Sequence, residues 1–155
     1  VHGVVPRVIL VADPSQLTGD ALTNYTILLK SGTRIVDLSG GANLESALDS
    51  LNTDAQWLVD AMLGTGAVGD PREPYRSAID WMNRQNSQRL AVDIPSGLDC
   101  NTGQAAASTV RANVTCTFVA AKIGFNNPAA LKYLGEVRVI PIGIDPQLAA
   151  TLSRE

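Results

Sequence analysis

Residues 57–70 read WLVDAMLGTGAVGD, and this stretch sets the pattern for the fold. An apolar strand carries an acidic residue, Asp60, near its C-terminal end and then breaks into a glycine-rich turn. Residues 90–99, LAVDIPSGLD, repeat the arrangement with Asp93 at the strand end. Unbroken apolar strands are typical of parallel sheets, whose carboxyl ends gather at one edge. We therefore expect the two acids to lie near one another at a ligand-binding edge.

Strands and helices alternate along the rest of the chain. We expect strands over residues 7–12, 34–38, 56–62, 89–94, 112–120 and 136–142, and helices over 18–30, 43–51, 74–84, 128–134 and 145–154. Thr18 and Asn43 are the expected N-caps of the first two helices, because their side-chain oxygens can accept from free backbone amides. The alternation predicts an α/β fold with a mostly parallel sheet and helices on both faces.

The composition limits the possible functions. A chain of 155 residues that is 45% hydrophobic has enough apolar material for one domain, which we expect to span residues 1–155. The net charge of −3 and the lack of a Lys/Arg cluster argue against nucleic-acid binding. No apolar run reaches the roughly 18 residues that a membrane span needs. One histidine and the lack of a Cys-x-x-Cys pair argue against a Cys/His metal site, so we expect any catalysis to come from Asp, Glu, Lys, Ser, Thr or Tyr.

Gly64-x-Gly66-x-x-Gly69 formally matches the dinucleotide-binding fingerprint. That motif normally opens a fold and leads straight into a helix, whereas here it follows the third strand, and Pro71 and Pro74 delay the helix. We therefore favour a ligand-binding loop of another kind. An ordinary NAD-dependent dehydrogenase and a turn shaped by chain geometry alone remain alternatives.

Asp60 and Asp93 are the most informative residues. A carboxylate inside an apolar strand is costly unless a cation, a ligand or backbone donors compensate it. Two such strand ends can supply a cation site and an acid–base group, and Ser96 adds a hydroxyl; the plainer interpretation is that the carboxylates cap neighbouring loops. Lys122, after the fifth strand, could face a pyrophosphate, but we expect a solvated loop lysine.

The same residues carry a family resemblance. VDAMLGTGAVGDPREPYRSAID over residues 59–80 and LAVDIPSGLDCNTG over 90–103 resemble the NAD(P)H-hydrate epimerase family, the YjeF N-terminal domain, in order and spacing. TFVAAKIGF over residues 117–125 and GEVRVIPIGID over 135–145 are also similar to the family. The resemblance covers roughly residues 5–147 and implies a Rossmann-like three-layer sandwich.

The resemblance also implies a function. The family interconverts the R and S forms of hydrated NADH or NADPH, which carry a hydroxyl at C6 of the nicotinamide ring, and a separate dehydratase repairs only the S form. By position, Asp60 and Ser96 match potassium ligands, and Asp93 matches the substrate-contacting aspartate, the best candidate for acid–base catalysis. The segment expected to wrap the substrate is Gly64, Thr65, Gly66, Ala67, Val68, Gly69 and Asp70. We expect a homodimer in the cytoplasm.

One departure from the family concerns its phosphate loop, Asn-Asn-Gly-Gly-Asp-Gly. This sequence does not occur here, and it would fall just before residue 1, so we expect the domain to be truncated at its N-terminus. A non-catalytic binding or dimerisation module of the same fold is the main alternative function, because fold does not fix function.

Overall fold

The computed structural model describes residues 3–4, 6–51 and 54–144. The chain divides into two compact units, Val1–Thr53 and Asp54–Glu155. The helix expected over residues 145–154 lies outside the described residues. Within the described ranges, no helix is both long and apolar enough to cross a membrane.

The first unit contains two parallel strands, two α-helices and a short 3-10 helix. Its elements are β1 (Val8–Leu10), η1 (Pro14–Gln16), α1 (Gly19–Lys30), β2 (Ile35–Asp37) and α2 (Leu44–Leu51). Val8 pairs with Ile35 in the parallel ladder. Asn43 caps α2 as predicted, since its side-chain oxygen accepts from the Ser46 amide at 3.0 Å. Thr18 precedes α1 but makes no capping hydrogen bond with its side chain.

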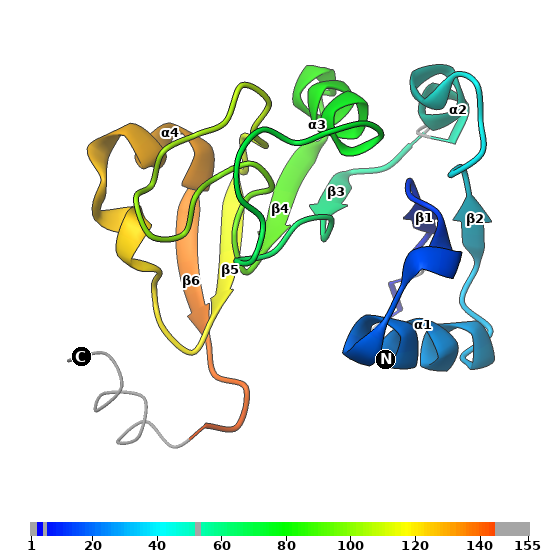
Figure 1. Ribbon diagram of the computed structural model, residues 1–155, viewed down its shortest axis with the longest axis horizontal. Coiled ribbons are helices and arrows are strands. Elements are labelled where there is room, and N and C mark those ends of the chain that lie inside the picture. The colour runs from blue at the N-terminus through cyan, green and yellow to red at the C-terminus, as the bar shows by residue number, and fades with distance from the viewer. Residues whose placement is uncertain (1–2, 5, 52–53, 145–155) are drawn as a thin grey trace. The chain divides into compact units, whose positions relative to one another are not determined.

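The second unit contains a four-stranded parallel sheet in the order β3-β4-β5-β6 (Figure 1). Its strands are β3 (Trp57–Asp60), β4 (Gln88–Val92), β5 (Val114–Phe118) and β6 (Glu136–Ile140). The connections contain α3 (Tyr75–Arg84), two 3-10 helices, η2 (Ile123–Asn126) and η3 (Pro128–Ala130), and α4 (Leu131–Leu134). Parallel strands alternating with helices confirm the predicted α/β class, the arrangement of Rossmann-like folds.

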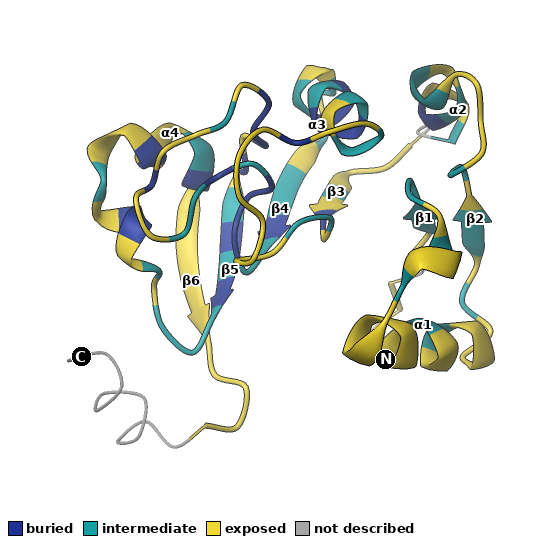
Figure 2. Ribbon diagram, viewed as in Figure 1, coloured by how far each residue is buried: buried dark blue, intermediate teal, exposed yellow. Residues whose placement is uncertain are grey.

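Burial differs among the strands of this sheet: β5 alternates between intermediate and buried residues, whereas β6 is exposed throughout (Figure 2). Strand pairing puts Asp60, Ala91, Thr115 and Thr117 on one face, and all four are buried. Trp57 and Val59 point to the other face and are exposed by 47% and 58%, as expected from the two-residue alternation along a strand. Asp60 thus lies beside these buried residues, whereas Val137 and Val139 of β6, which pair with Thr115 and Thr117 on the same face, are exposed by 38% and 49%.

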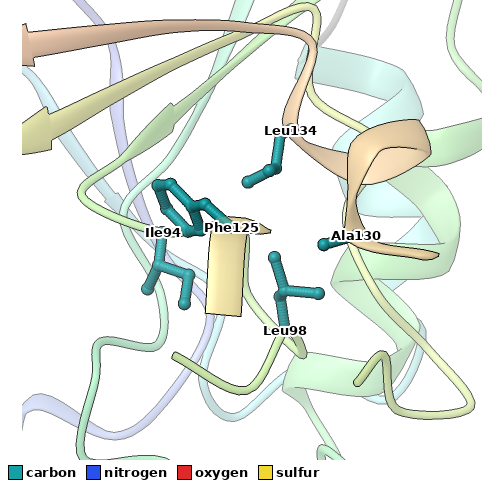
Figure 3. Packing of buried hydrophobic residues seen from close by; sticks show 5 residues of the cluster. All are labelled: Ile94, Leu98, Phe125, Ala130 and Leu134. Carbon is teal, nitrogen blue, oxygen red and sulfur yellow. The ribbon is translucent and has the colours of Figure 1, made fainter. Parts of the chain in front are cut away.

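A compact apolar cluster lies under the loops that follow β4 and β5 (Figure 3). Ile94 and Leu98 enter it from the loop after β4, and Phe125 enters from η2. Ala130 and Leu134 complete it from η3 and α4. Each large side chain buried in this way contributes roughly 1.5–3 kcal/mol. The cluster thus anchors the segment that carries Asp93 and Ser96.

Candidate active site

Both acids lie at the carboxyl ends of neighbouring strands, as predicted. Asp60 is the last residue of β3 and pairs with Ala91 of β4. Asp93 follows β4 directly, and its amide donates to the Cys116 carbonyl of β5 at 2.8 Å. In parallel α/β sheets this edge is the usual ligand-binding edge.

Asp60 is enclosed by Ser96 and the start of the next loop. The Ser96 amide donates to Oδ2 at 2.7 Å and the Ser96 hydroxyl donates to Oδ1 at 2.6 Å. The Met62 amide approaches Oδ1 at 3.3 Å. Asp60 is only 1% exposed, and burial raises its pKa, although the hydrogen bonds from Ser96 and Met62 oppose that rise. In the part of the chain that the structure describes, no positively charged side chain contacts this carboxylate.

The oxygens around Asp60 form a donor set suited to a hard cation. The Ser96 hydroxyl oxygen accepts from the Leu63 amide at 2.9 Å and lies 3.5 Å from the Leu63 carbonyl oxygen. A carboxylate, a hydroxyl and a backbone carbonyl therefore meet at one strand end. Because a buried carboxylate without a countercharge is unfavourable, a cation bound here would relieve the cost of its burial.

Asp93 occupies a strained backbone position. Its φ is 68°, and the Ile94 amide donates to the Val92 carbonyl at 2.9 Å across it. A hydrogen bond from residue i+2 to residue i around a positive-φ residue defines the classic γ-turn, which is rare and strained. Such outliers cluster at functional sites, where they fix the direction of a side chain.

The Asp93 carboxylate is anchored through one oxygen. Oδ1 accepts from Lys122 Nζ at 2.6 Å, from the Phe118 amide at 3.0 Å and from the Thr117 hydroxyl at 3.2 Å. Burial alone would raise the pKa of Asp93, but the hydrogen bond and charge of Lys122, with the Phe118 and Thr117 donors, outweigh it and lower the pKa below its usual value. Asp93 is therefore ionised near neutral pH.

The expectation that Lys122 is a solvated loop lysine is wrong. Its side chain is 20% exposed and pairs with Asp93, whose side chain is 22% exposed. Its Nζ also donates to the Phe118 carbonyl at 3.3 Å. The signal was present in the sequence, because Lys122 lies just past the end of β5 and Asp93 lies just past β4. Parallel neighbours bring such positions together.

The glycine-rich segment Gly64–Asp70 lies beside a cleft of about 230 Å³ that neither Asp60 nor Asp93 lines. The cleft is lined by Leu63, Gly64, Ala67, Gly69, Asp70, Pro95, Gly97, Leu98, Asp99, Gln104, Ala105 and Ala106. Two contacts tie the segment to the loop after β4: the Ala107 amide donates to Asp70 Oδ1 at 2.8 Å, and the Cys100 thiol lies 3.5 Å from the Thr65 carbonyl. Thr65, Gly66, Val68 and the two strand-end acids are not among the lining residues.

Packing requires a glycine at one position near the cleft but not at two others. Gly97 has a φ of +90°, and a Cβ there would lie 2.3 Å from the Ser108 carbonyl oxygen, so the fold itself requires glycine. A Cβ on Gly64 or Gly66 would meet no heavy atom of the described chain within 4 Å. Packing therefore does not explain these two glycines, and they leave open space beside the cleft.

Comparison with known proteins identifies the family. A family model described as "YjeF-related protein N-terminus" matches residues 1–124. The NAD(P)H-hydrate epimerase of Pirellula staleyi is 48% identical over 142 residues, which is 92% of this chain and 62% of that protein. The NAD(P)H-hydrate epimerase of Cenarchaeum symbiosum is 38% identical over 147 residues, 94% of this chain and 65% of that protein.

A third relative is longer. The bifunctional NAD(P)H-hydrate repair enzyme Nnr of Moorella thermoacetica is 34% identical over 150 residues, 97% of this chain and 28% of that protein. The chain thus spans less than two thirds of the length of each of these three relatives. The matches to the family model and to the two epimerases confirm the family resemblance: the chain belongs to the YjeF-related N-terminal family.

Proposed function

We propose that this protein is an isomerase that interconverts the R and S forms of hydrated NADH and NADPH. The observation that carries the proposal is the ionised Asp93, held through Oδ1 at a ligand-binding strand end. The relatives named NAD(P)H-hydrate epimerase support the choice of substrate. The delayed helix after Gly69 disfavours a dehydrogenase, because α3 begins only at Tyr75.

The reaction calls for acid–base chemistry at one carbon. The C6 hydroxyl of the hydrated ring lies next to the ring nitrogen, so a change of configuration requires the C6–O bond to break and to form again on the other face. The leaving oxygen gains a proton and departs as water, while the nitrogen lone pair forms a C=N double bond. Water then adds from the opposite face and loses a proton. Asp93 is the proposed acid–base group, a role that typically contributes ~10²–10⁴-fold to the rate.

Potassium is the proposed cofactor, and the oxygens around Asp60 fit it. Asp60, the Ser96 hydroxyl and the Leu63 carbonyl would hold the ion. When bound, it would supply a positive charge that offsets the buried carboxylate and favours a phosphate-bearing substrate nearby. The protein's own part is to keep these oxygens converged, which the Ser96 amide does by fixing Asp60 Oδ2 at 2.7 Å.

The remaining assignments follow from the proposed reaction. Gly64 to Asp70 would wrap the substrate, since the open space at Gly64 and Gly66 lets backbone amides approach a ligand. A dehydratase specific for the S form is the proposed functional partner, in line with relatives named as bifunctional repair enzymes. A homodimer in the cytoplasm is the proposed state of the protein.

A coupled assay tests the proposal. The R hydrate of NADPH is supplied with an excess of a dehydratase that accepts only the S hydrate, in potassium buffer, and NADPH formation is followed by absorbance. We expect the protein to accelerate NADPH formation above the rate measured without it. An unchanged rate, together with binding of the hydrate in a direct titration, would instead support a non-catalytic binding module.

A further inference from the structure

The contacts of Lys122 and Asp93 leave one donor and one acceptor unused. Lys122 Nζ carries three protons, of which one goes to Asp93 Oδ1 at 2.6 Å and one to the Phe118 carbonyl at 3.3 Å. Within residues 54–144, the third proton has no acceptor and Asp93 Oδ2 receives no hydrogen bond. An N–H donor and a carboxylate acceptor on one ion pair are complementary to a hydroxyl group, which accepts and donates at once.

Two matching turns hold this pair in place. The Ala120 amide donates to the Phe118 carbonyl at 2.8 Å around Val119, whose φ is 67°. This repeats, at the end of β5, the γ-turn that Asp93 makes at the end of β4. Positive φ is a marked outlier for a β-branched residue such as valine. The turn folds Lys122 back over the last residue of its own strand and onto Asp93.

We propose that Lys122 is a second acid–base residue of this site, which gives a proton to the leaving C6 hydroxyl while Asp93 accepts the proton that the returning water loses. The inference rests on the proposed epimerase function and deepens it. In place of one carboxyl that both protonates the leaving hydroxyl and deprotonates the returning water, Lys122 performs the first step and Asp93 the second. An ionised Asp93 has no proton of its own to give, whereas Lys122 is a protonated group in contact with it.

The proton and electron balance closes over one cycle. Nζ–H transfers a proton to the hydroxyl oxygen, the C6–O electron pair leaves with that oxygen as water, and the ring nitrogen lone pair forms the C=N bond. Water then attacks C6 from the other face, the C=N electron pair returns to nitrogen, and the excess proton passes to the Asp93 carboxylate. Return of that proton from the Asp93 carboxyl to the neutral Lys122 amine restores the ion pair.

Two substitutions of Lys122 distinguish a proton donor from a residue that supplies only a positive charge. Lys122→Met removes both the proton and the charge, and Lys122→Arg keeps a charge and donors but is a very weak acid. If Lys122 is the acid, both variants lose kcat, by ~10²–10⁴-fold for methionine, and arginine does not restore it. Lys132→Met is the matched control, because Lys132 is an exposed α4 lysine whose Nζ lies 5.0 Å from the centre of the Tyr133 ring.

Chemical rescue and NMR complete the test. Lys122→Ala should regain activity when methylammonium or ethylammonium is added, whereas a structural role gives no rescue. Wild-type kcat in Lys122→Met, or full activity in Lys122→Arg, would overturn the proposal while leaving the epimerase function in place. If the wild type itself is inactive, the proposed function fails instead. The NMR titration of the Asp93 carboxyl then still tests the ion pair, since its pKa should rise in Lys122→Met.

Discussion

The ends of β3 and β4 carry the same residue type in opposite electrostatic states. Asp60 is fully buried among neutral donors, and its burial raises its pKa. Asp93 is partly exposed, contacts the Lys122 ammonium and has a lowered pKa. The first environment favours a bound cation or a proton, and the second favours a free carboxylate. Neighbouring groups, and not the aspartate itself, therefore divide the two roles.

The largest expected effect is the loss of catalysis in Asp93→Asn. An amide cannot accept the proton that Asp93 is proposed to take, so kcat in the coupled assay should fall by ~10²–10⁴-fold. Asp37→Asn is the control, because Asp37 is not among the residues that line the cleft and fixes a turn through the Ser39 amide at 2.9 Å. A wild-type kcat in Asp93→Asn would show that Asp93 is not the acid–base residue.

The next largest effect concerns the turn that positions Ser96. Gly97→Ala puts a Cβ 2.3 Å from the Ser108 carbonyl oxygen at a φ of +90°. Strain and overpacking together should lower the free energy of unfolding by about 2–5 kcal/mol. Gly66→Ala, whose Cβ meets no described atom within 4 Å, serves as control in the same urea titration. Equal stability of the two variants would contradict the packing argument.

A smaller effect should follow from removing the hydroxyl that faces Asp60. Ser96→Ala deletes the 2.6 Å donor to Oδ1 and leaves a buried carboxylate oxygen with a poorer partner. A loss of about 1–3 kcal/mol in the free energy of unfolding is expected. Ser50→Ala, which removes an exposed hydroxyl bonded to its own helix, should be nearly neutral by comparison. Matching losses in the two variants would show that Asp60 does not depend on Ser96.

The positions of Asp60, Asp93 and Ser96 could be predicted from the sequence. The acid in an apolar strand and the Asp-Ile-Pro-Ser-Gly segment placed Asp60, Asp93 and Ser96 at one sheet edge, and the structure brings Asp60 and Ser96 into contact. Local patterns also located each described strand and α-helix, although the strands are shorter than expected and the 3-10 helices η1 and η2 were not predicted. These predictions succeeded because they depend on periodicity and strand direction.

The partner of Asp93 could not be predicted with the same rules. The contact between Lys122 and Asp93 depends on a γ-turn at Val119, and a valine does not predict a positive φ. Which residues line the cleft depends on the path of the loop over residues 95–106, where tertiary contacts decide the conformation. Side-chain pairing across loops is therefore the part of the site that required the structure.

The smallest expected effect tests whether Asp60 takes a cation. Potassium that binds only the folded state stabilises it by RT ln(1 + [K⁺]/Kd), about 1.4 kcal/mol at ten times Kd. Wild type should therefore melt at a higher temperature in potassium chloride than in choline chloride of equal ionic strength. Asp60→Asn, which keeps a side-chain acceptor for the Ser96 amide but no charge, should not respond. Equal responses in the two proteins would assign the effect to general salt screening.

The pH dependence of this stabilisation has a defined sign. Burial raises the pKa of Asp60 above its ordinary 3.8, so between pH 3.8 and that raised pKa the folded state without potassium binds more protons than the unfolded state. Stability contributed by Asp60 is then full below pH 3.8 and declines as the pH rises through the folded-state pKa. Potassium competes with that proton, so its effect should grow over the same pH range. Asp60 becomes charged as the pH rises. A potassium effect that weakens as the pH rises would therefore place the ion at another site.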